Sequence, residues 1–127
     1  MKNYLLDTNI LIYYLAGDIP KKELVKIKNI LNKSFNISII TKIELLGWNK
    51  HSPEGYKLAE EFIEFASVIN ITDEISDLTI KIKKNSKIKL PDAVIAATCL
   101  NDNLILVTRN DKDFKDIQDL EIYNPFK

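Results

Sequence analysis

The sequence predicts an α/β protein with three layers, α/β/α, in which helices cover both faces of a mostly parallel central sheet. Two observations support this fold class. Short apolar stretches that suit strands alternate along the chain with longer stretches whose apolar residues recur at helical spacing. Helices separate most of the strands, so consecutive strands are expected to run in the same direction.

The composition is typical of an ordinary soluble globular protein. Of the 127 residues, 46% are hydrophobic and 28% are charged, a mixture that excludes a disordered chain. This length predicts one domain over residues 1–127. No signal peptide precedes the first strand and no apolar stretch is long enough to span a bilayer, so we expect a cytoplasmic protein without a membrane partner.

The first two elements begin the alternation. Residues 4–6 form a short apolar stretch that ends on Asp7, which predicts a strand, and the apolar residues from Asn9 to Leu15 have helical spacing. Gly17 is typical of a helix end. Pro20 suits the first turn of a second helix, which we expect to extend to about Lys33.

The next strand is predicted at residues 35–40, which alternate apolar and polar positions and end on two isoleucines. Thr41 is the expected N-cap of the following helix, which extends to Trp48. Thr41 and Glu44 have the spacing of a capping box, in which Glu44 would bond the Thr41 N–H. The alternative is a functional role for Glu44, because it lies just past the end of a strand.

The second half of the chain continues the pattern. Helices are expected at residues 54–66, 73–85 and 92–100, and strands at residues 68–71, 104–107 and 121–123. Pro91 marks the start of the last helix, which is apolar almost all round and is therefore predicted to be buried. Cys99 lies in that helix and is interpreted as a core thiol, since a lone cysteine forms no disulfide within the chain.

Acidic residues recur where strands end. Asp7 and Glu44 each follow a predicted strand, Asp92 lies in the first turn of the buried helix, and residues 108–113 form an acidic loop after another strand. The carboxyl ends of parallel strands share one edge of a sheet, so these positions can converge in one crevice. Helix capping explains each acid singly. Four acids at corresponding positions are harder to explain in that way.

Carboxylates brought together repel one another unless a positive charge lies among them. Oxygen ligands without His or Cys favour Mg²⁺ or Mn²⁺. A pair of such ions suits phosphodiester hydrolysis, because one activates a water and the other stabilises the leaving oxygen. His51 is expected on a surface loop, since no second His exists to share a transition metal with it.

Four segments contain these acids. They are Leu5-Leu6-Asp7-Thr8-Asn9-Ile10-Leu11-Ile12, Thr41-Lys42-Ile43-Glu44-Leu45, Leu90-Pro91-Asp92-Ala93-Val94-Ile95-Ala96-Ala97 and Leu106-Val107-Thr108-Arg109-Asn110-Asp111-Lys112-Asp113-Phe114. In order and spacing they resemble the acidic motifs of PIN-domain ribonucleases, and the resemblance covers essentially the whole chain. Its length is similar to that of the VapC type, the toxin of toxin–antitoxin pairs.

The resemblance implies a PIN-like fold and a Mg²⁺- or Mn²⁺-dependent endoribonuclease. The catalytic, metal-coordinating acids that it implies are Asp7, Glu44, Asp92 and, as first choice for the fourth position, Asp113. Asp111 is the reserve for that position. The polar residues implied to hold the acids in place are Thr8, Asn9, Thr108 and Asn110. Arg109 is expected to contact a substrate phosphate, with a simple surface role as the alternative.

The resemblance also implies partners: an RNA substrate cleaved in a single-stranded loop, a second copy in a homodimer and a cognate antitoxin whose tail enters the site. Residues 13–15 beside Ile19 are a candidate apolar partner surface, although core packing explains them equally well. Total charge is uninformative, with 18 basic and 18 acidic residues. Lysines cluster at residues 21–28 and 81–89, either as solvated helix faces or beside an anionic substrate.

Three other functions would each require a different set of acids. A catalytically inactive PIN-like module that binds RNA or protein would have lost acids, whereas at least three are present here. A haloacid-dehalogenase type of phosphohydrolase needs a second Asp two residues after the first, where this chain has Asn9. A receiver-like signalling domain needs paired acids at its first strand and a phosphoacceptor Asp after a middle strand, and the sequence has neither.

Overall fold

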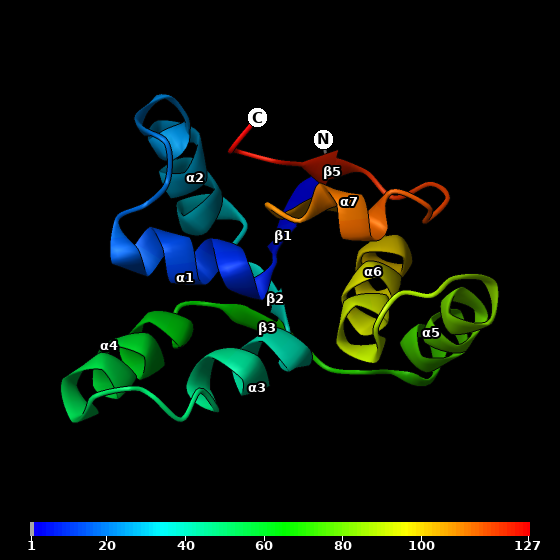
Figure 1. The fold of residues 1–127 in the computed structure, drawn as a ribbon, viewed down its shortest axis with the longest axis horizontal. Helices are drawn as coiled ribbons and strands as arrows, with labels where there is room; N and C mark the ends of the chain where they lie inside the picture. The colour runs from blue at the N-terminus through cyan, green and yellow to red at the C-terminus, as the bar shows by residue number, and fades with distance from the viewer. Residues whose placement is uncertain (1) are drawn as a thin grey trace.

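The computed structural model describes residues 2–127 and contains, within them, one five-stranded sheet whose strands are all parallel (Figure 1). The strands are β1 (Asn3–Leu6), β2 (Asn36–Ser38), β3 (Ser67–Ile69), β4 (Leu104–Val107) and β5 (Ile122–Tyr123). Their spatial order is β3-β2-β1-β4-β5. The order therefore reverses between β1 and β4, and at such a switch point ligands bind beyond the carboxyl ends of the strands.

Helices cover both faces of this sheet, which confirms the predicted fold class (Figure 1). They are α1 (Thr8–Ala16), α2 (Lys21–Lys33), α3 (Ile39–Leu46), α4 (Pro53–Ile63), α5 (Asp73–Asn85), α6 (Leu90–Asp102) and α7 (Asp111–Phe114). No helix in residues 2–127 is long and apolar enough to cross a membrane.

The two central strands supply both halves of the core. Leu5 lies in the apolar cluster formed with α5 and α6, whereas Leu6 lies in the cluster formed with α1, α2 and α4. Neighbouring residues of β4 divide in the same way, because successive side chains of a strand point to opposite faces. Cys99 is buried in the first cluster, as predicted.

The register of β1 and β4 positions the residues that follow them. Leu6 pairs with Val107, and the Asp7 N–H donates to the Val107 carbonyl at 2.9 Å. The chain after β1 and the chain after β4 therefore leave the sheet side by side. This places Asp7 and Thr108 together at the switch point.

The prediction for residues 35–41 was wrong at its C-terminal end. Strand β2 stops at Ser38, whose Oγ accepts a hydrogen bond from the Ile40 N–H at 3.1 Å and so caps α3. Ile39 and Ile40 belong to the helix, because tertiary packing outweighs their preference for strands. Thr41 is consequently a fully buried residue inside α3 rather than its N-cap.

Other differences are smaller. Helix α6 starts two residues earlier than predicted and continues to Asp102, where Asn103 ends it in the left-handed conformation with φ 57°. The loop after β4 contains the short helix α7, which was not predicted. Ile19 is only 6% exposed, so it cannot belong to a partner surface.

Candidate functional site

Asp7 lies at the centre of the candidate site, between the end of β1 and the start of α1. Its side chain is only 4% exposed. Oδ1 accepts a hydrogen bond from the Thr8 N–H at 2.8 Å, and Oδ2 accepts one from the Thr108 hydroxyl at 2.8 Å. The Asn9 amide also donates to Oδ2, at 3.2 Å. Thr8, Thr108 and Asn9, which were expected to hold the acids in place, thus fix the orientation of both Asp7 oxygens.

The pKa of Asp7 is raised to about 6, mainly because burial disfavours the charged carboxylate. The hydrogen bonds from Thr108 and Thr8 oppose this effect, whereas the negative charges of Asp92 and Glu44 add to it. Asp7 caps α1, which agrees with the alternative that its role is helix capping. Capping alone does not explain why Asp7 is buried or why other acids lie near it, because a cap requires neither.

Glu44 lies on α3 and is connected to the residues around Asp7 by a hydrogen bond from Thr8. The Thr8 hydroxyl donates a 2.7 Å hydrogen bond to Oε1 of Glu44, and its oxygen lies 3.0 Å from the hydroxyl of Thr41. The predicted capping-box bond is not made, because Thr41 lies inside the helix. Sequence reasoning missed Thr41 as a site residue. Its position one helical turn before Glu44, on the same face, is the signal that was available.

Asp92 lies half-buried in the first turn of α6. Its pKa is raised, first by burial and then by the negative charges of Asp113 and Glu44, while the positive charge of Lys89 lowers it. These interactions place Asp92 within electrostatic range of acids from α3 and α7. Four elements therefore contribute acids to one region: the end of β1, α3, α6 and α7.

The loop between β4 and α7 separates the candidates for the fourth acid. Thr108 is fully buried, and its hydroxyl accepts a hydrogen bond from the Asn110 N–H at 3.0 Å. Asp113 is the residue of this segment whose charge acts on Asp92. Asp111 instead forms an ion pair with Lys127 at 2.7 Å, and the Lys127 hydrogen bond is the main reason that its pKa is lowered. This geometry favours Asp113 over Asp111.

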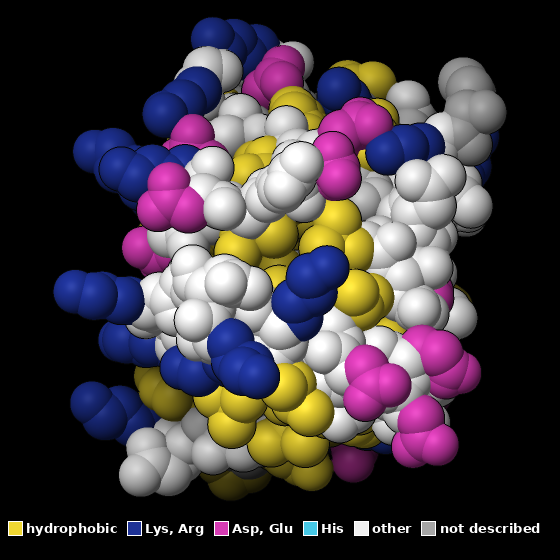
Figure 2. Space-filling view, turned by 90° about the vertical axis from the view of Figure 1, so that its right-hand side faces the viewer, with side chains coloured by type: hydrophobic (Ala, Val, Ile, Leu, Met, Phe, Trp, Pro, Cys, Tyr) yellow, Lys and Arg dark blue, Asp and Glu magenta, His cyan; other side chains and the backbone are white. Residues whose placement is uncertain are grey.

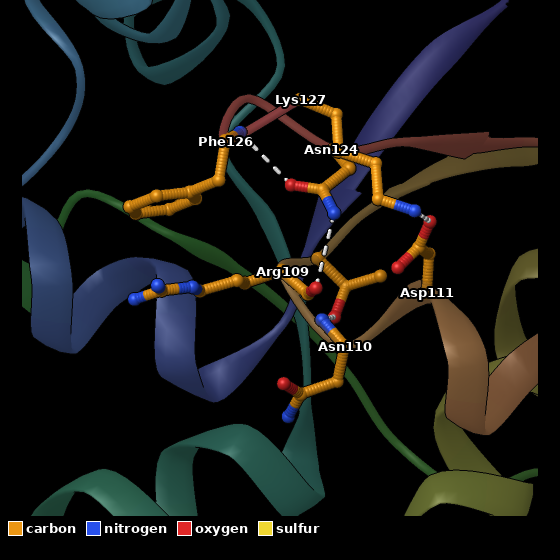
Figure 3. A network of polar contacts seen from close by, with 7 residues as sticks. Arg109, Asn110, Asp111, Asn124, Phe126 and Lys127 are labelled. Carbon is orange, nitrogen blue, oxygen red and sulfur yellow. Dashed lines mark hydrogen bonds and ion pairs between the residues drawn. The ribbon is translucent and has the colours of Figure 1, made fainter.

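Residues at the C-terminal end hold the same loop (Figure 3). The Asn124 amide donates to the Arg109 carbonyl at 3.0 Å, and its Oδ1 accepts from the Phe126 N–H at 2.9 Å. The Arg109 guanidinium carbon lies 4.4 Å from the centre of the Phe126 ring and 5.0 Å from that of Tyr13. A cavity of about 330 Å³ lies between this loop and residues 124–127.

The acids have no ion-pair partners among residues 2–127, where the two ion pairs join Lys2 to Glu121 and Lys127 to Asp111. An oxygen-only donor set of this charge fits a hard divalent cation. In the described part of the chain, no three Asp, Glu, His or Cys side chains are already arranged to hold an ion. One oxygen of the Glu44 carboxylate accepts the hydrogen bond from the Thr8 hydroxyl.

His51 lies apart from these acids. Its Nε2 is 2.7 Å from the Leu45 carbonyl, and its ring packs edge-on against Trp48 and Tyr56. The ring is therefore engaged in the connection between α3 and α4, which is a loop, as predicted for His51.

Comparison with known proteins decides the family. The model of the PIN domain matches residues 4–120. The chain belongs to the PIN domain family. The predicted resemblance to this family is thus confirmed. A search of curated proteins gave no match.

Solved structures resemble this PIN domain over nearly its whole length. A toxin–antitoxin complex from Klebsiella pneumoniae is 30% identical, with a TM-score of 0.76 and coverage of 98% of this chain and 99% of the other. VapBC-1 from nontypeable Haemophilus influenzae is 29% identical, with a TM-score of 0.82 and 98% coverage of both chains. DNA-bound VapBC from Salmonella typhimurium, at 24% identity, shares the fold with a TM-score of 0.83 over 98% of this chain and 99% of that one.

Proposed function

We propose that this PIN domain is a metal-dependent endoribonuclease and the toxin of a toxin–antitoxin pair. The observation that supports the enzyme best is the environment of Asp7. The Asp7 carboxylate is only 4% exposed, has a pKa raised to about 6 and is close to further acids. Keeping it charged at neutral pH lowers the stability of the folded protein. Such a cost is typical of a site whose charge is balanced by a bound cation.

The proposed ligands are Asp7, Glu44, Asp92 and Asp113, and the proposed cation is Mg²⁺ or Mn²⁺. When bound, the cation supplies the positive charge that lowers the pKa of an attacking water and stabilises the leaving oxygen of the phosphodiester. Thr108 and Asn9 orient the Asp7 carboxylate through their hydrogen bonds to Oδ2. Asn110 orients the loop through its backbone hydrogen bond to Thr108.

Arg109 is the proposed contact to a substrate phosphate. Its guanidinium is exposed but lies over the rings of Phe126 and Tyr13, which limits the orientations that it can adopt. A guanidinium held in this way donates to phosphate oxygens at a small entropic cost. The cavity beside it provides room for an RNA backbone next to Asp113.

An RNA cleavage assay tests the enzyme. The purified protein is incubated with a mixed RNA pool in Mg²⁺, in Mn²⁺ and in EDTA, beside the single variants Asp7→Asn and Asp92→Asn. Asp77→Asn is the matched control, since Asp77 is an exposed acid on α5. Cleavage that needs the metal, is lost in both site variants and survives in the control supports the proposal.

The second candidate function is a catalytically inactive module that binds RNA or protein. It is favoured by the arrangement of the acids, which in residues 2–127 are not yet placed around a single ion. If the wild-type protein cleaves nothing and binds no divalent cation, this function replaces the enzyme.

The proposed partners are an antitoxin and a second copy of the chain. Structures about 30% identical to this chain are a toxin–antitoxin complex and VapBC-1, which supports an antitoxin as partner. Helix α1 exposes Ile12 and Leu15, which an apolar partner helix would cover. Light scattering of the protein alone and with a candidate antitoxin tests both partners, and a monomer that binds no antitoxin would refute both.

A further inference from the structure

The most basic stretch of the chain has no counter-charges of its own. Residues 81–89, at the end of α5 and in the connector to α6, contain five lysines, and no acid lies between Asp77 and Asp92. All five lysines are exposed, and none takes part in an ion pair in the described residues. This stretch, here called the lysine segment, therefore carries five positive charges that its own sequence does not offset. Asp116 and Asp119 line a pocket with Lys81, at the end of the segment that lies farther from Asp92 in the sequence.

The lysine segment is held in a fixed conformation. Ile88 is only 7% exposed, its N–H donates to the Ser86 hydroxyl at 3.2 Å, and its carbonyl accepts from Lys83 Nζ at 2.8 Å. The backbone is extended at Ser86 and at Lys89. In an extended chain the neighbours of a buried residue point the opposite way. Lys87 and Lys89 are accordingly both exposed, on either side of Ile88.

The lysine segment ends at the candidate site. Lys89 is the N-cap residue of α6, and Asp92 lies in the first turn of that helix. Lys89 is also the positive charge that acts on the Asp92 carboxylate. Figure 2 looks onto the side formed by α5 and α6 and shows lysine or arginine side chains projecting along one edge, with acidic side chains among them in its upper half and a further group of acids on the other side. Through Lys89, the lysine segment thus borders Asp92 of the candidate site.

We propose that Lys84, Lys87 and Lys89 bind successive phosphates of a single-stranded RNA that extends away from the candidate site. This proposal rests on the proposed function, since an RNA backbone has to approach four acids that repel it. Lysines that a fixed backbone presents next to Asp92 offset that repulsion and direct the strand. A row of point charges on flexible stems suits phosphates and carries no base specificity.

The first lysine cluster provides a matched control. Lys21, Lys22 and Lys28 are exposed on α2, which lies on the opposite side of the molecule from α5 (Figure 1). Lys26 of the same helix already lies 3.9 Å from the centre of the Tyr123 ring. Neutralising three lysines in either cluster changes the net charge equally. Only the lysine segment borders the acids, so only its neutralisation is expected to weaken RNA binding.

The test is the salt dependence of RNA binding, measured by fluorescence anisotropy with a labelled single-stranded RNA in EDTA, where no metal-dependent cleavage occurs. For Lys84→Gln/Lys87→Gln/Lys89→Gln, the slope of log K against log salt is expected to fall in magnitude by about 2, because each phosphate that a lysine neutralises accounts for about 0.7 of the slope. The control Lys21→Gln/Lys22→Gln/Lys28→Gln is expected to retain the wild-type slope. The three Lys→Arg substitutions in the segment are expected to retain it as well.

Several results would overturn the proposal. They are an unchanged slope in the segment variant, an equal decrease in both Gln variants, a decrease in the Arg variant, and a wild-type protein that does not bind RNA. Loss of binding to an acidic protein partner with RNA binding intact would assign the segment to that partner instead. RNA binding that follows the prediction without cleavage in Mg²⁺ or Mn²⁺ would refute the proposed enzyme and leave the RNA interface standing.

Discussion

The hydroxyl of Thr108 donates a 2.8 Å hydrogen bond to Oδ2 of Asp7, across 101 residues of sequence. This bond joins the ends of β1 and β4, where the strand order of the sheet reverses. It is made within the core, because Thr108 is fully buried and Asp7 nearly so. The candidate site is therefore built into the centre of the fold, and changes there affect stability as well as chemistry.

Replacing Thr108 by Val tests this bond with almost no change in side-chain shape. The variant loses a donor to a buried carboxylate, so the free energy of unfolding at neutral pH should fall by about 1.5–3 kcal/mol. The pKa of Asp7 should rise further, since the Thr108 hydroxyl lowers it. Denaturant unfolding measures the first effect and the pH dependence of RNA cleavage the second. Thr108→Ser keeps the donor and serves as the control; equal behaviour of Val and Ser would contradict the account.

The raised pKa of Asp7 predicts an unusual dependence of stability on pH. Between the ordinary value of 3.8 and about 6, the folded state binds more protons than the unfolded state, so this group's contribution to stability decreases as the pH rises. The loss is complete above pH 6 and amounts to about 3 kcal/mol. Asp7→Asn should lack it and be more stable than the wild type at pH 7. Denaturant unfolding of both proteins from pH 4 to 7 measures the difference in their free energies of unfolding. A difference that stays constant over this range would refute the prediction.

The cap of α3 gives a prediction that separates folding from activity. Ser38 caps the helix through its buried hydroxyl, so Ser38→Ala should lower the free energy of unfolding by about 1 kcal/mol and leave RNA cleavage unchanged. Thr41 contacts Thr8 beside Glu44, so Thr41→Val should reduce cleavage. Unfolding and cleavage are measured on both variants. If Ser38→Ala loses cleavage and Thr41→Val retains it, the assignment of Ser38 to folding and of Thr41 to activity is wrong.

Asn124 is expected to affect RNA cleavage, because it holds the loop that contains Arg109. Asn124→Ala removes the hydrogen bonds to the Arg109 carbonyl and the Phe126 N–H, with an expected cost of about 1 kcal/mol for each bond. A less constrained Arg109 should raise KM for RNA more than it lowers kcat. Lys127→Gln, which removes an exposed ion pair with Asp111, should leave the free energy of unfolding nearly unchanged, because solvent screens such a pair. Equal kinetic effects of the two variants would argue against a positioning role for Asn124.

The central part of the site could be predicted from sequence because it depends on strand ends. A short apolar strand that stops on an acid places that acid at the carboxyl edge of a parallel sheet, whatever the details of packing. This rule predicted the position of Asp7 and of the loop that begins at Thr108, whereas the role of Thr108 in holding the acids was implied by the resemblance to PIN-domain ribonucleases. Asp92 followed from Pro91, which marks the start of a buried helix.

Other features depended on contacts that no local pattern encodes. Ile39 and Ile40 prefer strands, but they lie in the first turn of α3, and this error hid the position of Thr41. The hydrogen bond from the Asn124 side chain to the Arg109 carbonyl joins residues that are 15 apart in the sequence. Such pairings are fixed only once the sheet has brought β4 and β5 together.

Direct binding of Mn²⁺, followed by the loss of its free-ion EPR signal, tests the central claim that these acids form a divalent metal site. The account predicts saturable binding to the wild type and to Asp77→Asn, and binding at least about tenfold weaker in Asp7→Asn and in Asp92→Asn. Equal binding by all four proteins, or none by the folded wild type, would contradict it.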